Sequence, residues 1–573
     1  MNRREFLLSG AAAVCAGKVP PVKPPLAEFG YRDVDFLPDR PVERQVRENH
    51  ALLLALSEDS LLRPFRVREG LPAPGSDLGG WYDTYAFAPG ATFGQWVSAL
   101  ARFYAITGDP ATRAKVARLV EGYGATIDPE GKFYINNRFP SYTYDKLVLG
   151  LIDAHEFAGD PQALSILQRA TDAALPYQPL RAMPRQETPV LHNEDFTRHC
   201  WDESYTMPEN LFLAWRRSGD ARYLALAKRF LYNDEFFFPL ARGENVLPGK
   251  HAYSHVNALS SAAQACLVLR DETYLRAARN GFAFVQQQSY VTGGWGPDEH
   301  FFPPDSGKLA ESLTSTHNSF ETPCGSYAHF KITRYLLRIT SDSRYGDSME
   351  RIWYNAILGA KPIQPDGRAF YYSDYNFDGR KFFDPDKWPC CSGTLPQIAA
   401  DYRISAYFQD SRGVYVNLYS PSTVTWKRAG ATYALRQTTD YPNKSNIGLD
   451  VTASSPAEFS IFVRVPEWAE GARATVSGRH ESRALRPGSF AEIWRKWKTG
   501  DRIELELPLK VRLEPVDALH LNIVAVMAGP SVLMAPPNTT ATRAQLLAGT
   551  GLGLKSFMDI GDEPYTTYVR VTG

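Results

Sequence analysis

Two adjacent cysteines, Cys390 and Cys391, lie in the stretch KWPCCSG, although the chain of 573 residues contains only six cysteines. Neighbouring thiols allow three interpretations: unrelated buried thiols, a vicinal disulfide, or two thiolates that bind one soft metal ion. Upstream, Glu321 and Cys324 stand at the start of a strongly helical pattern, so one helical turn places both side chains on one face. A glutamate and three cysteines form a closed tetrahedral ligand set for Zn²⁺. The sequence therefore favours a zinc site made of Glu321, Cys324, Cys390 and Cys391.

Those side chains belong to a chain that is long enough for two or three domains. Lysine plus arginine and aspartate plus glutamate each total 63, so the formal net charge is zero. No basic excess points to a nucleic-acid partner. Aromatic residues make up 13 % of the chain, which fits either a large core or a carbohydrate cleft that is walled with rings.

The first 20 residues, MNRREFLLSGAAAVCAGKVP, differ from the rest of the chain. A twin arginine, Arg3 and Arg4, precedes a short apolar run rich in alanine, which is typical of a twin-arginine export signal. We expect export to the periplasm or the outside of the cell. The run is too short to span a bilayer, and no later apolar segment is long enough, so no membrane span is expected. The sparse cysteines do not resemble a disulfide framework.

The larger, N-terminal part of the chain repeats a weak pattern, in which one helical stretch ends and an aspartate begins the next. Five aspartates stand at this place: Asp109, Asp160, Asp220, Asp271 and Asp342. Each is placed to cap a helix, twice with proline at the first helical position, and apolar residues then recur at three- and four-residue steps. Such helical hairpins bury their apolar faces only against one another. We predict an (α/α)6 barrel over residues 30–408, with an open solenoid as the alternative.

From Gly413 the pattern changes to alternating polar and apolar residues in segments separated by Gly, Pro, Asn and Asp. Examples are GVYVNLYSPSTVTW, AEFSIFVRVPEW and RIELELPLKVRLEPV. Alternation with period two predicts strands that bury one face. We predict a β-sandwich over residues 409–540 and a C-terminal extension over residues 541–573, either separate or part of the same β module.

The segment from Glu321 to Tyr402 resembles the β-L-arabinofuranosidases of glycoside hydrolase families 127 and 146. The matching elements are the Glu-Thr helix start with its cysteine, YGDSMERIWYNAIL, and the Cys-Cys pair followed by SGTLPQIAADY. The segments YTYDKLVLGLIDAHEFAGD, GKHAYSH and FSIFVRVPEW also resemble the family, so the similarity covers most of the chain. The resemblance implies an (α/α)6 barrel followed by β-sandwich modules.

In that family a zinc-bound cysteine is the nucleophile of a retaining glycosidase. The resemblance implies that Cys390 attacks the sugar, that Glu321, Cys324 and Cys391 complete the zinc site, and that a thioglycoside forms and is hydrolysed. Zinc would remove the thiol proton, which a free cysteine with a pKa of about 8.5 mostly keeps at neutral pH. The relatives place the Glu and Cys one residue closer together. With Pro323 inserted here, Cys324 either reaches the metal from a shifted helix start or leaves a three-ligand site.

The resemblance also implies an acid/base glutamate before the Glu321 helix, where Glu299 and Glu311 are available. We predict Glu299, because the glycine-rich, aromatic-flanked GWGPDEHF looks like a loop at the barrel mouth, where partial desolvation would raise its pKa. Four other side chains match sugar-contacting segments of the family: His251, His255, Tyr144 and Lys146.

The sequence thus predicts an exported, zinc-dependent retaining glycoside hydrolase with a cysteine nucleophile. Its expected substrate is a glycan that carries β-L-arabinofuranose or a similar sugar. Two alternatives stay open: a lyase or epimerase of uronic sugars on the same barrel, and a non-catalytic glycan-binding protein with a structural zinc.

Overall fold

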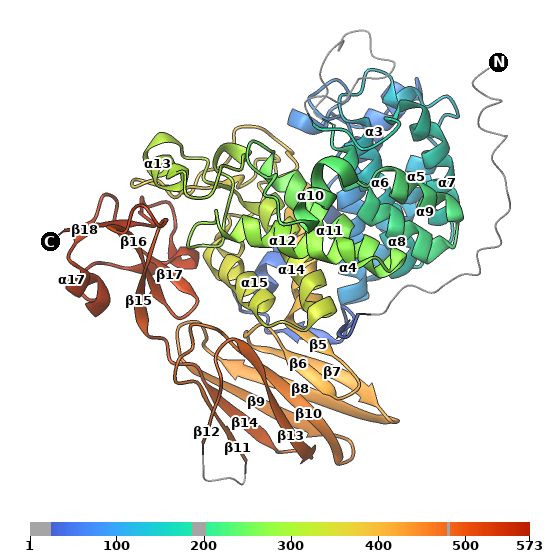
Figure 1. Ribbon diagram of the computed structural model, residues 1–573. Coiled ribbons are helices and arrows are strands. Elements are labelled where there is room, and N and C mark those ends of the chain that lie inside the picture. The colour runs from blue at the N-terminus through green and yellow to red at the C-terminus, as the bar shows by residue number, and fades with distance from the viewer. Residues whose placement is uncertain (1–23, 186–201, 478–481, 573) are drawn as a thin grey trace.

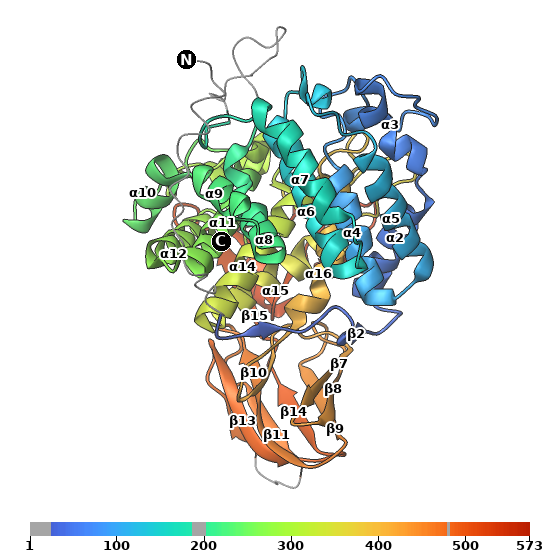
Figure 2. The same cartoon turned by 90° about the vertical axis from the view of Figure 1, so that its right-hand side faces the viewer.

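The computed structural model describes residues 24–185, 202–477 and 482–572 of the chain (Figure 1). The predicted export signal, residues 1–20, lies outside the described residues. A helical domain forms the larger body, a β-sandwich packs against one end of it, and a smaller β unit at the C-terminus lies beside both (Figures 1 and 2). None of the described helices is both long and apolar enough to cross a membrane.

In the described part of the chain, six helices form a closed inner ring in which each packs on the next and the last returns to the first. These inner helices are α4 (Phe93–Thr107), α6 (Pro140–Ala158), α8 (Pro208–Ser218), α11 (Ala252–Leu269), α14 (Thr322–Thr340) and α16 (Cys391–Ala406). Helix α11 is buried on all sides from Ala252 to Val268, as expected for a helix with neighbours all around it. Helices α4 and α6 touch through glycines: a Cβ on Gly94 would lie 1.9 Å from the Lys146 carbonyl oxygen.

The outer helices are amphipathic and cover this ring. They include α2 (Pro41–Ala55), α3 (Glu58–Arg68), α5 (Pro110–Gly124), α7 (Ala163–Ala174), α9 (Ala221–Arg229), α12 (Glu272–Gln286) and α15 (Arg344–Asn355), while the short α10 (Phe238–Ala241) and α13 (Lys308–Ser315) lie in connections. Asp109, Asp220 and Asp271 accept backbone hydrogen bonds as N-caps, as the repeat predicted. The N-caps of α7 and α15 are instead Gln162 and Ser343, which follow Asp160 and Asp342. The predicted (α/α)6 barrel is confirmed.

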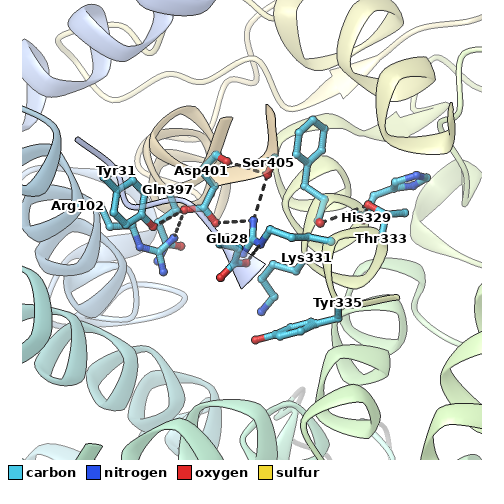
Figure 3. Close-up of polar contacts among 12 residues, drawn as sticks. Glu28, Tyr31, Arg102, His329, Lys331, Thr333, Tyr335, Gln397, Asp401 and Ser405 are labelled. Carbon is cyan, nitrogen blue, oxygen red and sulfur yellow. Dashed lines mark hydrogen bonds and ion pairs between the residues drawn. The ribbon is translucent and has the colours of Figure 1, made fainter. Parts of the chain in front are cut away.

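A buried ionic network ties three inner helices together (Figure 3). Asp401 of α16 accepts hydrogen bonds from Arg102 of α4, at 2.9 Å, and from the Tyr31 hydroxyl, at 2.8 Å. Its second carboxylate oxygen lies 3.1 Å from Arg334 of α14. Burial would raise the pKa of Asp401, but Arg102 and Arg334 outweigh burial and lower it. The carboxylate is therefore ionised and compensates for two buried guanidinium groups.

Asp401→Asn is expected to lower the free energy of unfolding by about 3–5 kcal/mol, because it leaves buried charge without its partner. Since the folded-state pKa of Asp401 lies below the unfolded value of about 3.9, this stabilisation is complete at neutral pH and is lost on acidification through the folded-state pKa. Denaturant unfolding at neutral pH measures the effect. Asp35→Asn, which removes an ion-pair partner of Arg403 that is 78 % exposed, is the matched control and should change stability by less than about 1 kcal/mol. Equal effects of both variants would contradict the assigned role.

The β-sandwich consists of two sheets with the alternating burial that the sequence predicted, for example along β8. One sheet has the order β1 (Ala27–Glu28), β5 (Tyr407–Gln409), β6 (Gly413–Val416), β10 (Ala457–Val465), β13 (Ser489–Trp497). The other has the order β12 (Arg483–Ala484), β11 (Arg473–Val476), β14 (Arg502–Glu506), β9 (Asn446–Ala453), β8 (Ala431–Thr439), β7 (Ser422–Arg428), β2 (Val34–Phe36). Strands β1 and β2 come from the N-terminal segment, so the two ends of the helical domain are both anchored in the sandwich.

The C-terminal unit is a separate sheet with a small core of its own. It contains β15 (Val511–Pro515), β16 (Ile523–Ala528), β17 (Ser531–Met534), β18 (Thr540–Ala541), β19 (Lys555–Ser556) and β20 (Val569–Val571), with α17 (Arg543–Ala548). The predicted division at residue 540 falls inside this sheet. The C-terminal unit also contacts the segment that precedes α16. Lys381 of that segment is buried, and its ammonium group donates hydrogen bonds to two carbonyl oxygens of the unit, those of Phe557 at 2.7 Å and Ile560 at 2.9 Å.

Candidate active site

The N-cap residues of five inner helices line one cavity of about 400 Å³ at the mouth of the barrel. They are Thr92, Phe139, His251, Glu321 and Cys390. The inner helices therefore present their N-terminal ends to the cavity. Because a helix N-terminus carries partial positive charge and free N–H groups, this arrangement stabilises the anionic side chains that line the cavity.

The predicted metal ligands meet on one side of this cavity. Cys390 Sγ lies 3.3 Å from Glu321 Oε1, and Cys324 Sγ lies 3.6 Å from Cys391 Sγ. All four donor atoms lie within 4.8 Å of one another. Cys324 reaches the cluster because Glu321 is the N-cap of α14 and Cys324 is its third residue, positions whose side chains face each other as in a capping box. Cys390 and Cys391 are free thiols, so they form no vicinal disulfide.

Negative charge in this cluster is concentrated on Cys390. Burial raises the pKa of Cys390, but hydrogen bonds from the other two thiols and from Tyr371 outweigh it and hold that pKa well below its usual range. Burial, and then the charge on Cys390, raises the pKa of Glu321 well above its usual range. Burial also raises the pKa of Cys324 and of Cys391. The protein alone stabilises one negative charge here, whereas a divalent cation would compensate for several.

The cluster fits a zinc ion by its donors and by its spacing. In a tetrahedron with bonds of about 2.3 Å, ligand atoms lie about 3.8 Å apart, close to the separations of 3.3 Å and 3.6 Å found here. Glu321 Oε2 is buried and has no hydrogen-bond partner among the described residues. A buried carboxylate oxygen of this kind is costly unless an ion or another donor binds it.

Glu299 lies on the cavity wall and is joined to the cluster through Tyr371. The Tyr371 hydroxyl lies 3.1 Å from Glu299 Oε1 and 3.5 Å from Cys390 Sγ. Tyr372 donates to the same carboxylate oxygen at 2.6 Å, and His251 Nε2 lies 3.0 Å from the other. One phenol thus bridges the predicted nucleophile and the predicted acid/base.

The expected raised pKa of Glu299 is wrong. Burial does act to raise it, but the hydrogen bond from His251 and the charge and hydrogen bonds around it, including that of Tyr372, lower the pKa to about 2. Burial, then Arg185, lowers the pKa of His251, so its ring is neutral at pH 7. His251 Nδ1 caps α11 by accepting from the Ser254 backbone N–H, which leaves the proton on Nε2 to bind Glu299. The carboxylate is therefore ionised and is ready to accept a proton.

A short strand pair brings these groups together. Strand β3 (Phe320–Glu321) pairs with β4 (Tyr372–Ser373), and Glu321 is directly opposite Tyr372. The same strand pairing therefore positions Glu321, a candidate metal ligand, and Tyr372, which binds Glu299. Sequence reasoning missed Tyr371 and Tyr372; the only signal was the Tyr-Tyr doublet in FYYSD.

Of the predicted sugar contacts, His251 lines the cavity. The other three, His255, Tyr144 and Lys146, are not among its lining residues. The His255 ring packs between Tyr205 and Phe236. The Tyr144 hydroxyl points to Thr171 of outer helix α7, at 2.9 Å. Lys146 forms an ion pair with Asp145 at 2.9 Å and is 3 % exposed. From the same helix, Tyr142 does line the cavity. Helix α6 is buried on nearly every side, so periodicity could not tell which of its residues face the site.

Comparisons with known proteins match this architecture. A model of the GH127 β-L-arabinofuranosidase catalytic domain matches residues 33–403, and a model of the GH127 middle domain matches residues 413–509. The crystal structure of a GH127 β-L-arabinofuranosidase from Geobacillus stearothermophilus T6 is 18 % identical, with a TM-score of 0.69 over 94 % of this chain and 100 % of that chain. A second GH127 β-arabinofuranosidase is 17 % identical, with a TM-score of 0.74 over 96 % and 98 %. No curated protein matches the sequence.

At such identities the solved structures establish the fold, whereas the catalytic-domain model matches well over half of the sequence. This chain is therefore a glycoside hydrolase that belongs to the GH127 β-L-arabinofuranosidase family.

Proposed function

We propose that the protein is a zinc-dependent retaining glycosidase that uses the Cys390 thiolate as nucleophile and Glu299 as acid/base. The observation that carries this proposal is the position of Cys390. It is the only cysteine among the described residues that line the cavity, while Cys324 and Cys391 are fully buried behind it. Cys390 Sγ is therefore the sulfur of the cluster that a substrate in the cavity can reach, whereas Cys324 and Cys391 are placed only to bind an ion.

The residues at the site support a double displacement. Cys390 Sγ attacks the anomeric carbon while Glu299 gives a proton to the departing oxygen, which forms a thioglycoside and frees the aglycone. Glu299, now ionised, takes a proton from water, and that water attacks the anomeric carbon and breaks the carbon–sulfur bond. Two inversions retain the anomeric configuration. Glu321, Cys324, Cys390 and Cys391 would hold Zn²⁺, which when bound keeps thiolates ionised at neutral pH.

The cavity lining favours an uncharged sugar. Apart from Glu321, which belongs to the candidate metal cluster, the described lining residues include four carboxyl groups and a single arginine: Glu203, Glu299, Asp384 and Asp386, with Arg185. A uronic acid would meet this excess of negative charge, which counts against the alternative of a uronic-sugar lyase. Aromatic rings, including Trp81 and Tyr142, supply apolar faces for a sugar ring. We propose a glycan that carries β-L-arabinofuranose or a similar sugar as the substrate, and export by the twin-arginine route from residues 1–20.

Metal analysis of the purified protein is expected to find about one zinc ion per chain, since one four-donor cluster is present. Removing the ion with a strong chelator should abolish hydrolysis of an aryl β-L-arabinofuranoside and lower the thermal midpoint, because the buried donors lose their shared partner. Adding Zn²⁺ back should restore both. A panel of aryl pentofuranosides and pyranosides identifies the sugar. Full activity in a chain without metal would rule out the proposed role of zinc.

A further inference from the structure

Three buried polar atoms on the cavity wall have no hydrogen-bond partner among the described residues. They are Thr92 Oγ1, Glu203 Oε2 and Tyr253 Oη. Their side chains are at most 4 % exposed. Buried polar groups in folded proteins are almost always hydrogen-bonded, so these three atoms need partners that the protein does not supply, and a ligand or water in the cavity can supply them. The similar unpaired oxygen of Glu321 belongs to the metal cluster described above, but these three atoms do not.

Glu203 lines the cavity with one carboxylate oxygen paired and the other without a hydrogen-bond partner among the described residues. Its Oε1 forms an ion pair with Arg185, whose Nε lies 3.5 Å away. The turn that carries it is fixed at the preceding residue, where the Asp202 carboxylate accepts the backbone N–H groups of Ser141 at 3.1 Å and Tyr142 at 2.9 Å. Arg185 balances the charge of the carboxylate. The remaining oxygen, Oε2, can only accept a hydrogen bond.

The three atoms come from different elements around the cavity. Thr92 caps α4, Glu203 precedes a short 3₁₀ turn (Ser204–Thr206), and Tyr253 lies in the first turn of α11. Two hydroxyls that can donate or accept, together with one carboxylate acceptor, suit a ligand that carries several hydroxyl groups. A site built to bind a hydroxyl rejects an analogue without it far more strongly than an apolar pocket rejects a missing methylene.

We propose that Glu203, Tyr253 and Thr92 bind hydroxyl groups of the sugar that Cys390 attacks, and that Glu203 is the residue that selects a sugar with a hydroxyl at its position. This inference rests on the proposed function and extends it by naming the residues that recognise the sugar. Glu203 is a binding residue in it and takes no part in proton transfer.

Glu203→Gln tests the proposal with little change in shape. The glutamine oxygen will stay with Arg185, so its NH₂ group replaces Oε2 and a donor replaces the acceptor. We expect kcat/KM for the best aryl pentofuranoside to fall about 10- to 100-fold. For the monodeoxy substrate that lacks the partner hydroxyl, the same change should cost less than about threefold, as a double-mutant cycle requires. Glu311→Gln, which changes an exposed carboxylate outside the cavity, is the matched control and should behave as the wild type.

Binding of the free sugar to Cys390→Ser, measured by calorimetry, separates recognition from chemistry. Adding Glu203→Gln to Cys390→Ser should weaken binding by a factor similar to the loss in kcat/KM. Tyr253→Phe gives a second test that does not depend on the stability of the Glu203 variant, with an expected loss of about 3- to 10-fold. Unchanged kcat/KM in both variants of an active enzyme overturns this inference and leaves the proposed function standing. A wild-type enzyme that hydrolyses none of the glycosides overturns the proposed function itself.

Discussion

Cys390→Ser is expected to lower kcat for an aryl β-L-arabinofuranoside by at least about 10⁴-fold, because removal of a nucleophile eliminates the covalent pathway. A serine hydroxyl stays protonated where the Cys390 thiol is ionised by its hydrogen bonds and by its place at the N-terminus of α16. Steady-state kinetics measures the loss. Metal analysis of the same variant shows whether zinc is retained, which separates loss of the nucleophile from loss of the ion.

Two observations can contradict this prediction. Cys266→Ser removes a buried thiol on α11 outside the cluster, and its activity should stay within about twofold of the wild type. Rapid quenching of the wild-type enzyme followed by mass spectrometry should find one sugar residue on the peptide that contains Cys390. Full turnover in Cys390→Ser, or a sugar attached to another residue, would show that the nucleophile is misassigned.

Glu299→Gln is expected to lower kcat by about 10²- to 10⁴-fold, the usual effect of losing a general acid/base. The amide can neither protonate the leaving oxygen nor activate water. A small anionic nucleophile such as azide needs no base, so it should restore part of the turnover of an activated aryl glycoside and yield a glycosyl azide. Asp298→Asn is the neighbouring control, because the Asp298 carboxylate binds Thr316 at 2.6 Å instead of the site tyrosines. If Asp298→Asn lowered kcat more than Glu299→Gln did, Asp298 and not Glu299 would be the acid/base.

The low pKa of Glu299 has a consequence for the pH dependence of the reaction. With a pKa of about 2 in the free enzyme, Glu299 is in its base form throughout the neutral range, and its acid form decreases tenfold with each pH unit. For a substrate with a poor leaving group, kcat/KM should therefore fall as the pH rises from about 4 to 7, whereas an activated aryl glycoside should show no such fall. Tyr372→Phe removes a hydrogen bond to the carboxylate and should move the falling limb to higher pH. Identical profiles for both substrates would exclude Glu299 as the acid.

The sequence alone predicted the helical repeat, the sandwich and the four candidate metal ligands. Helix caps such as Asp109 and Asp271 act within a few residues of themselves, and period-two alternation describes a strand without reference to its partners. The spacing from Glu321 to Cys324 is also local, since it is the step from the N-cap to the third residue of one helix. The prediction that Cys390 and Cys391 join this helix start came from the chemistry of the donors, and the structure brings all four donor atoms within 4.8 Å of one another.

Only the tertiary structure decided what surrounds these groups. The pairing of β3 with β4 joins residues that are some fifty positions apart and helps to place Tyr371 and Tyr372 beside Glu299. Burial by itself would raise the pKa of Glu299, but the hydrogen bond from His251, at the start of α11, and then that from Tyr372 lower it. The burial of Tyr144 and the position of Glu203 on the cavity wall also depend on how the ring of helices closes. Electrostatic and hydrogen-bonding effects act through space, so they follow from which segments meet and not from the order of residues along the chain.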